Sequence, residues 1–236
     1  MQVKNSIRAR GRLRACLFFL LAAVLSGIAV FALLYLLIPL DVGQVTRIES
    51  SPALYDARGR LFHLRLSSNS EWQIPIPLSE MGKWLPLVAV GVEDGRFYSH
   101  PGIDPLALLR ATAQNIAARR VVSGASTITS QLIRLSISER GPSEREPSET
   151  ELSERKSSER ESSEREPSER GPAVPARRAR NLGTKVREFI QAMKLERVMT
   201  KEKILENYLN HAPFGGNIRG VQAASLLYFG KPALKL

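Results

Sequence analysis

The chain has 236 residues, a formal net charge of +11 and a single cysteine. This length suffices for one medium domain beside a membrane anchor, and it excludes two full catalytic domains. The lone Cys16 excludes a disulfide framework and a cysteine-based metal site. The three histidines show no ligand spacing, and no His-Glu-x-x-His occurs, so the sequence predicts no protein-held metal site.

Residues 15–40 form an apolar segment without a charged side chain. A helix of about 20 apolar residues can cross a bilayer. Residues 1–14 carry only basic charges, which predicts a cytoplasmic N-terminus. A cleaved signal peptide is the alternative, but its apolar region has about 7–15 residues and ends at a small-residue cleavage site. We therefore expect a retained single-pass anchor at 15–40 behind a cytoplasmic basic tail, with everything after it on the outer side.

Residues 41–138 predict a small β element followed by helices. The stretch 54–61 has two apolar runs around a glycine-containing turn, which indicates a hairpin. Residues 84–92 are mostly apolar and read as helix, and Asp104-Pro105 is a typical helix start with aspartate as N-cap. We expect this segment to be the first part of a mainly α domain.

Residues 139–180 differ in composition from the rest of the chain and form a low-complexity repeat. In this segment Ser-Glu-Arg recurs with Gly-Pro, Glu-Pro or Ser between copies. Between 139 and 172 there is no aromatic residue, and Leu152 is the only large aliphatic one. Such a composition cannot bury enough apolar surface to offset chain entropy, so we expect a disordered insertion. A solvated linker is the default interpretation, and a partner-binding arm is the alternative.

Residues 181–236 return to a helical pattern and form the expected second part of the domain. Thr200 is a plausible N-cap for the second helix of this block. One face of the first helix is expected to be apolar, at Val186, Phe189, Ile190 and Met193. The block also carries an excess of positive charge, which could meet acidic lipid or a phosphate-bearing ligand. Nucleic acid is not an expected partner for a domain exported past the membrane.

Two adjacent acids, Glu93 and Asp94, follow an apolar stretch and form the first candidate for chemistry. A carboxylate in a partly apolar setting is a candidate general base. Arg96 and His100 follow closely and could bind or steer a charged ligand. An ordinary surface pair at a helix end is the alternative interpretation.

Two further clusters are rich in groups that bind polar ligands. Residues 124–131 contain four hydroxyls and an amide, which suit a sugar or a phosphate oxygen. A helix N-cap with a Ser/Thr run gives the same pattern. Lys185 and Arg187 lie beside Glu188, and the alternative there is an ion-pair face on a helix.

Together and in this order, the clusters resemble the peptidoglycan glycosyltransferase module, family 51, of class A penicillin-binding proteins and monofunctional transglycosylases. The matching segments lie at residues 93–102, 124–132, 185–188, 204–210 and 214–231. The sequence of residues 210–216 is most similar to the penicillin-binding protein 1C branch. Departures from the usual family residues occur at Gly95, Ala125, Ser130 and Thr184.

The resemblance implies a mainly α, lysozyme-like glycosyltransferase lobe that polymerises lipid II into glycan strands in bacterial cell-wall synthesis. The transfer would invert the anomeric centre and release undecaprenyl pyrophosphate. Glu93 would be the general base for the acceptor hydroxyl, and Glu188 the second catalytic glutamate, near the donor. The implied substrate-binding residues are Asp94, Arg96, His100, Arg110, Ser126, Thr127, Gln131, Arg134, Lys185 and Arg187.

The implied partners are lipid II, the nascent glycan strand and a cell-wall synthesis complex. The implied location is the bacterial inner membrane, with a periplasmic catalytic domain. No cofactor is certain from the resemblance, and a divalent metal such as Mg²⁺ at the pyrophosphate is the one candidate.

Two architectural features depart from the family pattern. The repeat at 139–180 lengthens a connection that is normally short, and the chain stops at Leu236 before the remaining helices of the lobe. We therefore expect a truncated, incomplete lobe. The main alternative function is a non-catalytic, membrane-anchored fragment that binds lipid II or cell-wall partners. A membrane-anchored lytic enzyme that cleaves glycan is the third hypothesis.

Overall fold

The structure is a computed structural model that describes residues 2–59, 61–120, 124–138 and 182–236. The predicted disordered insertion at 139–180 lies outside the described residues. Contacts divide the chain into two compact units, Met1–Leu40 and Asp41–Leu236. We refer to them as the first unit and the second unit.

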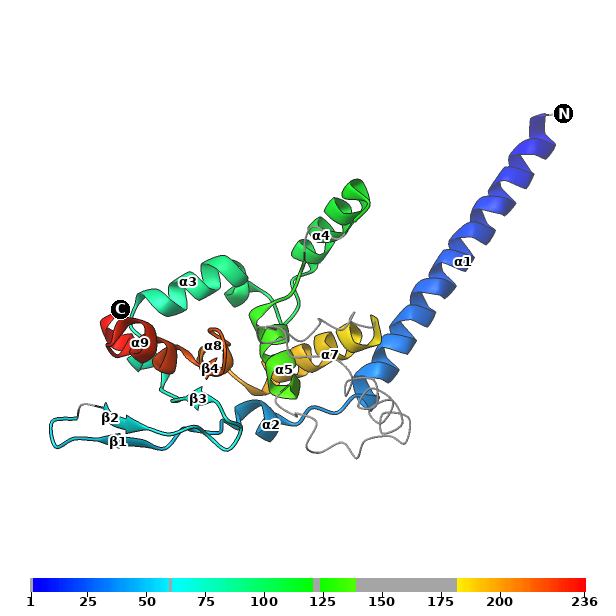
Figure 1. Cartoon of the computed structure of the whole chain (residues 1–236). Helices are drawn as coiled ribbons and strands as arrows, with labels where there is room; N and C mark the ends of the chain where they lie inside the picture. Colours follow the sequence, from blue (N-terminus) through cyan, green and yellow to red (C-terminus); the bar gives the residue numbers. More distant parts are fainter. Residues whose placement is uncertain (1, 60, 121–123, 139–181) are drawn as a thin grey trace, which may run out of the picture. The chain divides into compact units, whose positions relative to one another are not determined.

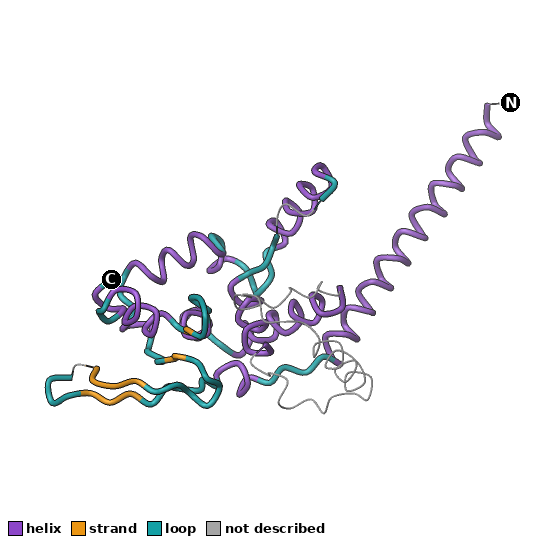
Figure 2. Tube along the Cα trace, in the orientation of Figure 1, coloured by secondary structure: helices purple, strands orange, loops and turns teal. Residues whose placement is uncertain are grey.

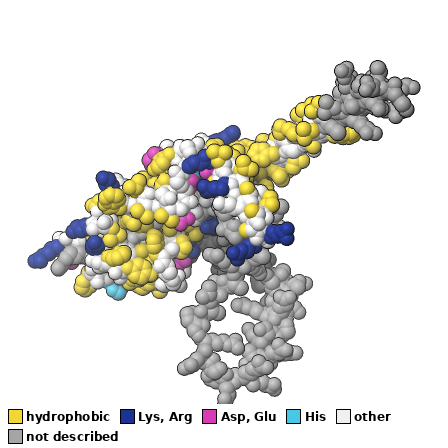
Figure 3. Space-filling model, turned by 90° about the horizontal axis from the view of Figure 1, so that it is seen from above, with side chains coloured by type: hydrophobic (Ala, Val, Ile, Leu, Met, Phe, Trp, Pro, Cys, Tyr) yellow, Lys and Arg dark blue, Asp and Glu magenta, His cyan; other side chains and the backbone are white. Residues whose placement is uncertain are grey.

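The first unit is a single helix, α1 (Gln2–Leu37), drawn in blue in Figure 1. Its segment Leu17–Leu37 has a mean hydropathy of 2.8, and none of this segment is buried. Hydrophobic side chains dominate the coloured part of this helix (Figure 3). By length and composition, the segment can cross a membrane. The helix also runs back through the basic N-terminal residues, since Arg and Lys are good helix formers.

The second unit opens with the short helix α2 (Val42–Thr46), capped by Asp41. Strands β1 (Ala53–Tyr55) and β2 (Leu61–Leu64) then pair antiparallel, so the predicted hairpin is confirmed. The turn between them is closed by a 2.9 Å hydrogen bond from the Gly59 amide to the Asp56 carbonyl. Gly59 has a φ of 72°, a conformation that glycine adopts without steric cost.

A second pair of strands joins distant parts of the chain. Strand β3 (Trp72–Gln73) pairs in parallel with β4 (Ile218–Arg219), and Trp72 lies opposite Ile218. Both strands are drawn as orange segments in Figure 2. The sequence does not predict this pairing, because two-residue strands carry too little periodicity to be recognised.

Helices make up most of the second unit, and the fold class is confirmed as mainly α with a small β element. Two predicted N-caps are observed: Asp104 accepts a 2.9 Å hydrogen bond from the Ala107 amide, and Thr200 a 3.3 Å bond from the Lys203 amide. The α-helices are α3 (Trp84–Glu93), α4 (Pro105–Ala118), α5 (Ile128–Ser138), α7 (Leu182–Val198), α8 (Lys201–His211) and α9 (Val221–Phe229). Short 3₁₀ turns lie at η1 (Leu78–Glu80), η2 (Phe97–Ser99) and η5 (Ala233–Lys235).

The core forms where α5 packs against both α7 and α8 (Figure 1). Large side chains of all three helices are fully buried there, namely Ile128, Leu132, Ile190, Leu195, Ile204 and Leu205. The buried face of α7 is displaced from the predicted one, because Val186, Phe189 and Met193 are only partly buried. This packing fixes the N-terminal end of α5 next to the loop that follows α3.

Helices α3 and α4 contrast with this core, since their large apolar side chains face outward. Neither helix packs extensively, and α3 buries no side chain at all. The exposed apolar side chains are Trp84, Leu87, Val88, Val92, Leu106, Leu108, Leu109 and Ile116. Exposed apolar surface on this scale is typical of a site that meets lipid or another molecule.

Candidate active site

Glu93 is the last residue of α3, and its side chain is exposed. The Gln131 Nε2 on α5 donates a 2.9 Å hydrogen bond to the Glu93 Oε2. The Tyr208 hydroxyl on α8 donates to the Gln131 Oε1 at 3.5 Å, which is a long contact. Gln131 therefore links α3, α5 and α8, and the Glu93 carboxylate keeps access to solvent while one of its oxygens is held.

The pKa of Tyr208 reports on the charges around this carboxylate. Burial, the largest cause, and the negative charge of Glu93 together raise the pKa of Tyr208 from 10.0 to about 12, against the opposing effect of the Arg134 cation, which lowers it. Glu93 and Arg134 therefore both lie within electrostatic reach of the phenol.

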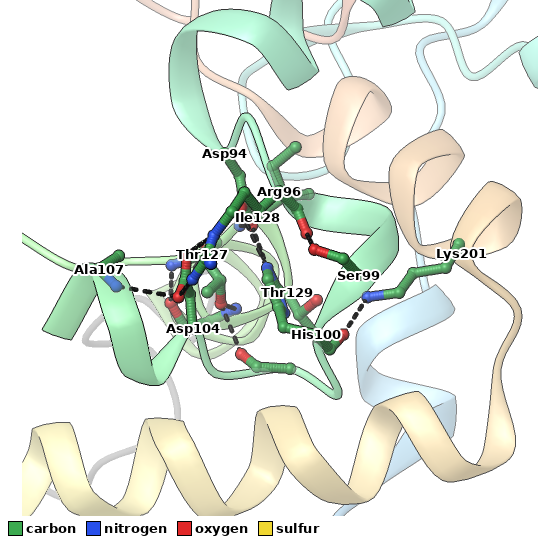
Figure 4. A network of polar contacts seen from close by, with 12 residues as sticks. Asp94, Arg96, Ser99, His100, Asp104, Ala107, Thr127, Ile128, Thr129 and Lys201 are labelled. Atoms are coloured by element: carbon green, nitrogen blue, oxygen red, sulfur yellow. Dashed lines mark hydrogen bonds and ion pairs between the residues drawn. The ribbon is translucent and has the colours of Figure 1, made fainter.

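Asp94 has a different environment from its neighbour, because it is buried with an exposed fraction of 8%. Its carboxylate lies 3.0 Å from the His100 Nε2 at both oxygens, and its Oδ2 accepts a 3.0 Å hydrogen bond from the Ile128 amide. The Ile128 amide is at the N-terminus of α5, where an anionic acceptor is favourable. Figure 4 shows Asp94 linking the loop to this helix.

Arg96 pairs with another side chain of the protein, Asp104. Its Nε donates a 2.9 Å hydrogen bond to the Asp104 Oδ2, and its Nη2 contacts the Asp104 Oδ1. The same Asp104 caps α4 through the Ala107 amide. This two-point pairing of a guanidinium with a carboxylate is strong and directional, and it fastens the loop to the start of α4.

The Ser/Thr cluster forms the start of α5. The Ser130 amide donates to the Thr127 Oγ1 at 3.2 Å, and the Thr127 amide donates to the Ser130 Oγ at 3.0 Å. This is a capping box in which serine takes the place usually held by Glu or Gln. The departure at Ser130 thus has a structural use, and the N-cap alternative is observed for Thr127, while Ser126 is exposed.

Gly102 allows the loop to approach α7 closely. Its φ is +92°, and a Cβ atom there would lie 2.7 Å from the Ala192 carbonyl oxygen. The Gly102 carbonyl accepts a 2.7 Å hydrogen bond from the Thr127 hydroxyl. Glycine is therefore required at this point for both conformation and space.

The remaining predicted residues lie on α4, α5 and α7. Glu188 is buried, with an exposed fraction of 7%, whereas its neighbours Lys185 and Arg187 are exposed. Arg134 is partly buried on α5, and Arg110 is exposed on α4. The structure thus brings Glu93, Gln131 and Arg134 together around Tyr208. The catalytic and substrate-binding roles assigned from the sequence remain predictions for all of the residues named above.

Three further residues belong to this region and were not singled out as site residues. Tyr208 lies within the segment 204–210 that matches the family, and it contacts Gln131. Lys201 and Glu196 form an ion pair of 2.8 Å beside the loop. Helical spacing could mark Tyr208 as inward-facing, but nothing local in the sequence indicates that Lys201 reaches a loop one hundred residues away.

The geometry suits proton transfer at Glu93. An exposed carboxylate that is oriented through one oxygen can accept a proton from a hydroxyl group at its side. Among the described residues, no group of three His, Cys, Asp or Glu side chains is placed to hold a metal ion. The described side chains therefore do not form a metal site by themselves.

The transglycosylase family model matches residues 60–160 and 172–236, which is well over half of the chain. The chain therefore belongs to the transglycosylase family, and the resemblance to the peptidoglycan glycosyltransferase module of class A penicillin-binding proteins is confirmed.

Among curated relatives, it is similar to penicillin-binding protein 1C of Escherichia coli, with 29% identity over 70% of this chain and 16% of that protein. It is also similar to penicillin-binding protein 1A of Aquifex aeolicus, with 30% identity over 78% of this chain and 20% of that protein. Penicillin-binding protein 4 of Bacillus subtilis is 28% identical over 84% of this chain and 25% of that protein. The chain thus spans a quarter or less of the length of these relatives.

Proposed function

We propose that the chain is a peptidoglycan glycosyltransferase module that polymerises lipid II into glycan strands. The observation that carries this proposal is the exposed Glu93 carboxylate, held by Gln131 in a member of the transglycosylase family. An oriented, accessible carboxylate is the group that sugar transfer to a hydroxyl acceptor requires.

In the proposed reaction, Glu93 takes the proton of the acceptor sugar's 4-hydroxyl group. The hydroxyl oxygen forms a bond to the anomeric carbon of the donor, and the bond from that carbon to the pyrophosphate oxygen breaks. The bonding electrons leave with undecaprenyl pyrophosphate, and attack from the opposite side inverts the anomeric centre. The Gln131 amide holds one carboxylate oxygen, which directs the other toward the acceptor.

The developing negative charge on the pyrophosphate needs cationic partners. In this proposal they are Arg110, Arg134, Lys185 and Arg187, of which three are exposed and Arg134 is partly buried. Charge-assisted hydrogen bonds to phosphate oxygens are strong and stabilise a leaving anion. Glu188 is proposed as the second glutamate, near the donor. A divalent metal such as Mg²⁺ at the pyrophosphate is the one proposed cofactor, and it would add positive charge beside the leaving group.

The proposed location is the bacterial inner membrane, with the N-terminus in the cytoplasm and the second unit in the periplasm, within a cell-wall synthesis complex. The apolar segment Leu17–Leu37 supports anchoring. The exposed apolar side chains of α3 and α4 support contact between the second unit and lipid. A lipid-linked substrate confined to the bilayer would then meet an enzyme confined beside it.

The test is polymerisation of fluorescent lipid II by the full chain in detergent micelles or lipid vesicles. Glu93→Gln should reduce the initial rate by at least about 100-fold, because the acceptor proton loses its base. Glu80→Gln is the matched control, since Glu80 is another exposed glutamate, and this variant should keep the rate.

Unchanged polymerisation by Glu93→Gln would remove Glu93 from the mechanism. Lipid II binding without polymer in the unmodified chain would favour the non-catalytic fragment. Release of soluble muropeptides from sacculi would favour the hypothesis of a lytic enzyme that cleaves glycan.

A further inference from the structure

Lys201, the first residue of α8, lies at the centre of a partly buried set of contacts outside its own helix. Its ammonium group donates a 2.7 Å hydrogen bond to the His100 carbonyl oxygen and a 2.8 Å hydrogen bond to the Glu196 Oε1. It also lies 4.4 Å from the ring centroid of Phe97, within the range of a cation–π contact. The side chain is only 19% exposed.

The helix itself does not favour a cation at this position. The N-terminus of a helix carries a partial positive charge, so a lysine in the first turn is electrostatically unfavourable. Glu196, whose side chain is 6% exposed, offsets this cost by pairing with the ammonium group. The contacts that Lys201 makes are therefore the reason for its placement.

These contacts join two segments on which the candidate base depends. On one side, Lys201 holds the backbone of His100, whose Nε2 lies 3.0 Å from the carboxylate oxygens of Asp94. On the other side, Glu196 accepts a hydrogen bond from the hydroxyl of Thr129 on α5. Figure 4 shows Lys201 reaching the loop at His100, with Thr129 close by.

Both segments adjoin Glu93, one through the chain and the other through a hydrogen bond. Asp94 is its neighbour in the chain, and Gln131, one turn into α5, donates the hydrogen bond that holds the Glu93 carboxylate. Asp94 also caps α5 through the Ile128 amide at 3.0 Å, so the loop and the helix are already joined at that point. Lys201 with Glu196 fastens them at a second point.

We propose that Lys201, paired with Glu196, is a positioning residue that sets Glu93 against the acceptor hydroxyl. This inference rests on the proposed function, because it gives Glu93 the role of base. Lys201 acts through His100, Asp94 and α5 and makes no contact with Glu93 itself. Its loss should therefore lower kcat and leave substrate binding nearly unchanged.

The test compares Lys201→Met with Lys203→Met in the full chain. Lys203 is the matched control, because it lies in the same turn of α8 and pairs with Glu206 at the surface. Lys201→Met should lower kcat by about 10- to 100-fold, the size expected when a reacting group shifts by about 1 Å, with KM changed less than about threefold. Lys203→Met should match the unmodified chain, and Lys201→Arg, which keeps the charge, should recover part of the lost kcat.

Hydrogen exchange supplies a readout independent of turnover. The amides of residues 94–100 and 128–131 should exchange faster in Lys201→Met than in Lys203→Met. Should Lys201→Met fail to fold, Glu196→Gln takes its place, since it keeps an acceptor for Thr129 and removes only the charge, and it should lower kcat about 3- to 10-fold.

A folded Lys201→Met variant with kcat within twofold of the unmodified chain would overturn the proposal, as would an unchanged kcat in Glu196→Gln. Equal exchange in Lys201→Met and Lys203→Met would overturn it as well. If the proposed function itself is wrong, the unmodified chain makes no polymer, which distinguishes that outcome from a failure of the Lys201 proposal. The exchange measurement still decides whether Lys201 fixes the loop to α5.

Discussion

The helices α3 and α8 have nearly the same length, 10 and 11 residues, but opposite environments. α3 buries none of its side chains, whereas α8 buries most of them. α8 is also tied to the segment before α3, since the Gln73 Nε2 donates a 2.9 Å hydrogen bond to the Asn210 carbonyl. The core therefore fixes α8 directly, while the end of α3, where Glu93 lies, depends on the polar contacts of the loop that follows it.

The largest expected contrast is in stability. Leu205→Ala on α8 should lower the free energy of unfolding by about 2–5 kcal/mol, because Leu205 is fully buried and the change leaves a cavity. Leu87→Ala on α3 should change it by less than about 0.5 kcal/mol, since Leu87 is 59% exposed. Urea unfolding followed by circular dichroism measures both, and equal losses would contradict the contrast.

The second contrast separates Asp94 from Glu93, which are neighbours in the chain. Asp94→Asn should lower the free energy of unfolding by about 1–3 kcal/mol, because the buried contacts to His100 and the Ile128 amide need a carboxylate acceptor. Glu93→Gln should stay within about 0.5 kcal/mol, because Glu93 is exposed. The same unfolding assay compares them, and a larger loss in Glu93→Gln would reverse the assignment.

The smallest contrast appears at alkaline pH and concerns Tyr208. Because its pKa of about 12 in the folded state lies above the ordinary 10.0, the unfolded chain releases the phenol proton first. The stability that Tyr208 contributes is therefore complete below pH 10 and is lost as the pH rises toward 12, by about 1–2 kcal/mol. Unfolding measured between pH 9 and pH 11.5 should show this loss in the unmodified chain and a smaller one in Tyr208→Phe. An identical pH dependence would argue against the raised pKa.

Local sequence signals predicted the features that are set locally. The N-caps at Asp104 and Thr200 are confirmed, because a capping side chain binds amides only a few residues ahead. The hairpin is confirmed for a similar reason, since a glycine turn between apolar runs closes on itself. An apolar segment long enough to span a bilayer was readable from composition alone.

The rest depends on contacts between distant segments. Residue spacing alone does not predict that Asp94 is buried against the N-terminus of α5 while its neighbour Glu93 stays exposed. The Lys201 contact with His100 and the pairing of β3 with β4 each join residues at least one hundred positions apart. No local period or spacing in one sequence encodes such contacts.

The parallel pairing of Trp72 with Ile218 also bears on how the chain comes to be folded. A ribosome makes the chain from its N-terminus, so β3 exists long before its partner strand has been synthesised. Contacts between residues this far apart in sequence form slowly, because the intervening chain must first be brought to order. Until then the edge of β3 has unpaired backbone groups, which makes the nascent chain prone to non-native strand pairing. Strand β4 is thus required to complete a structure that begins near residue 72.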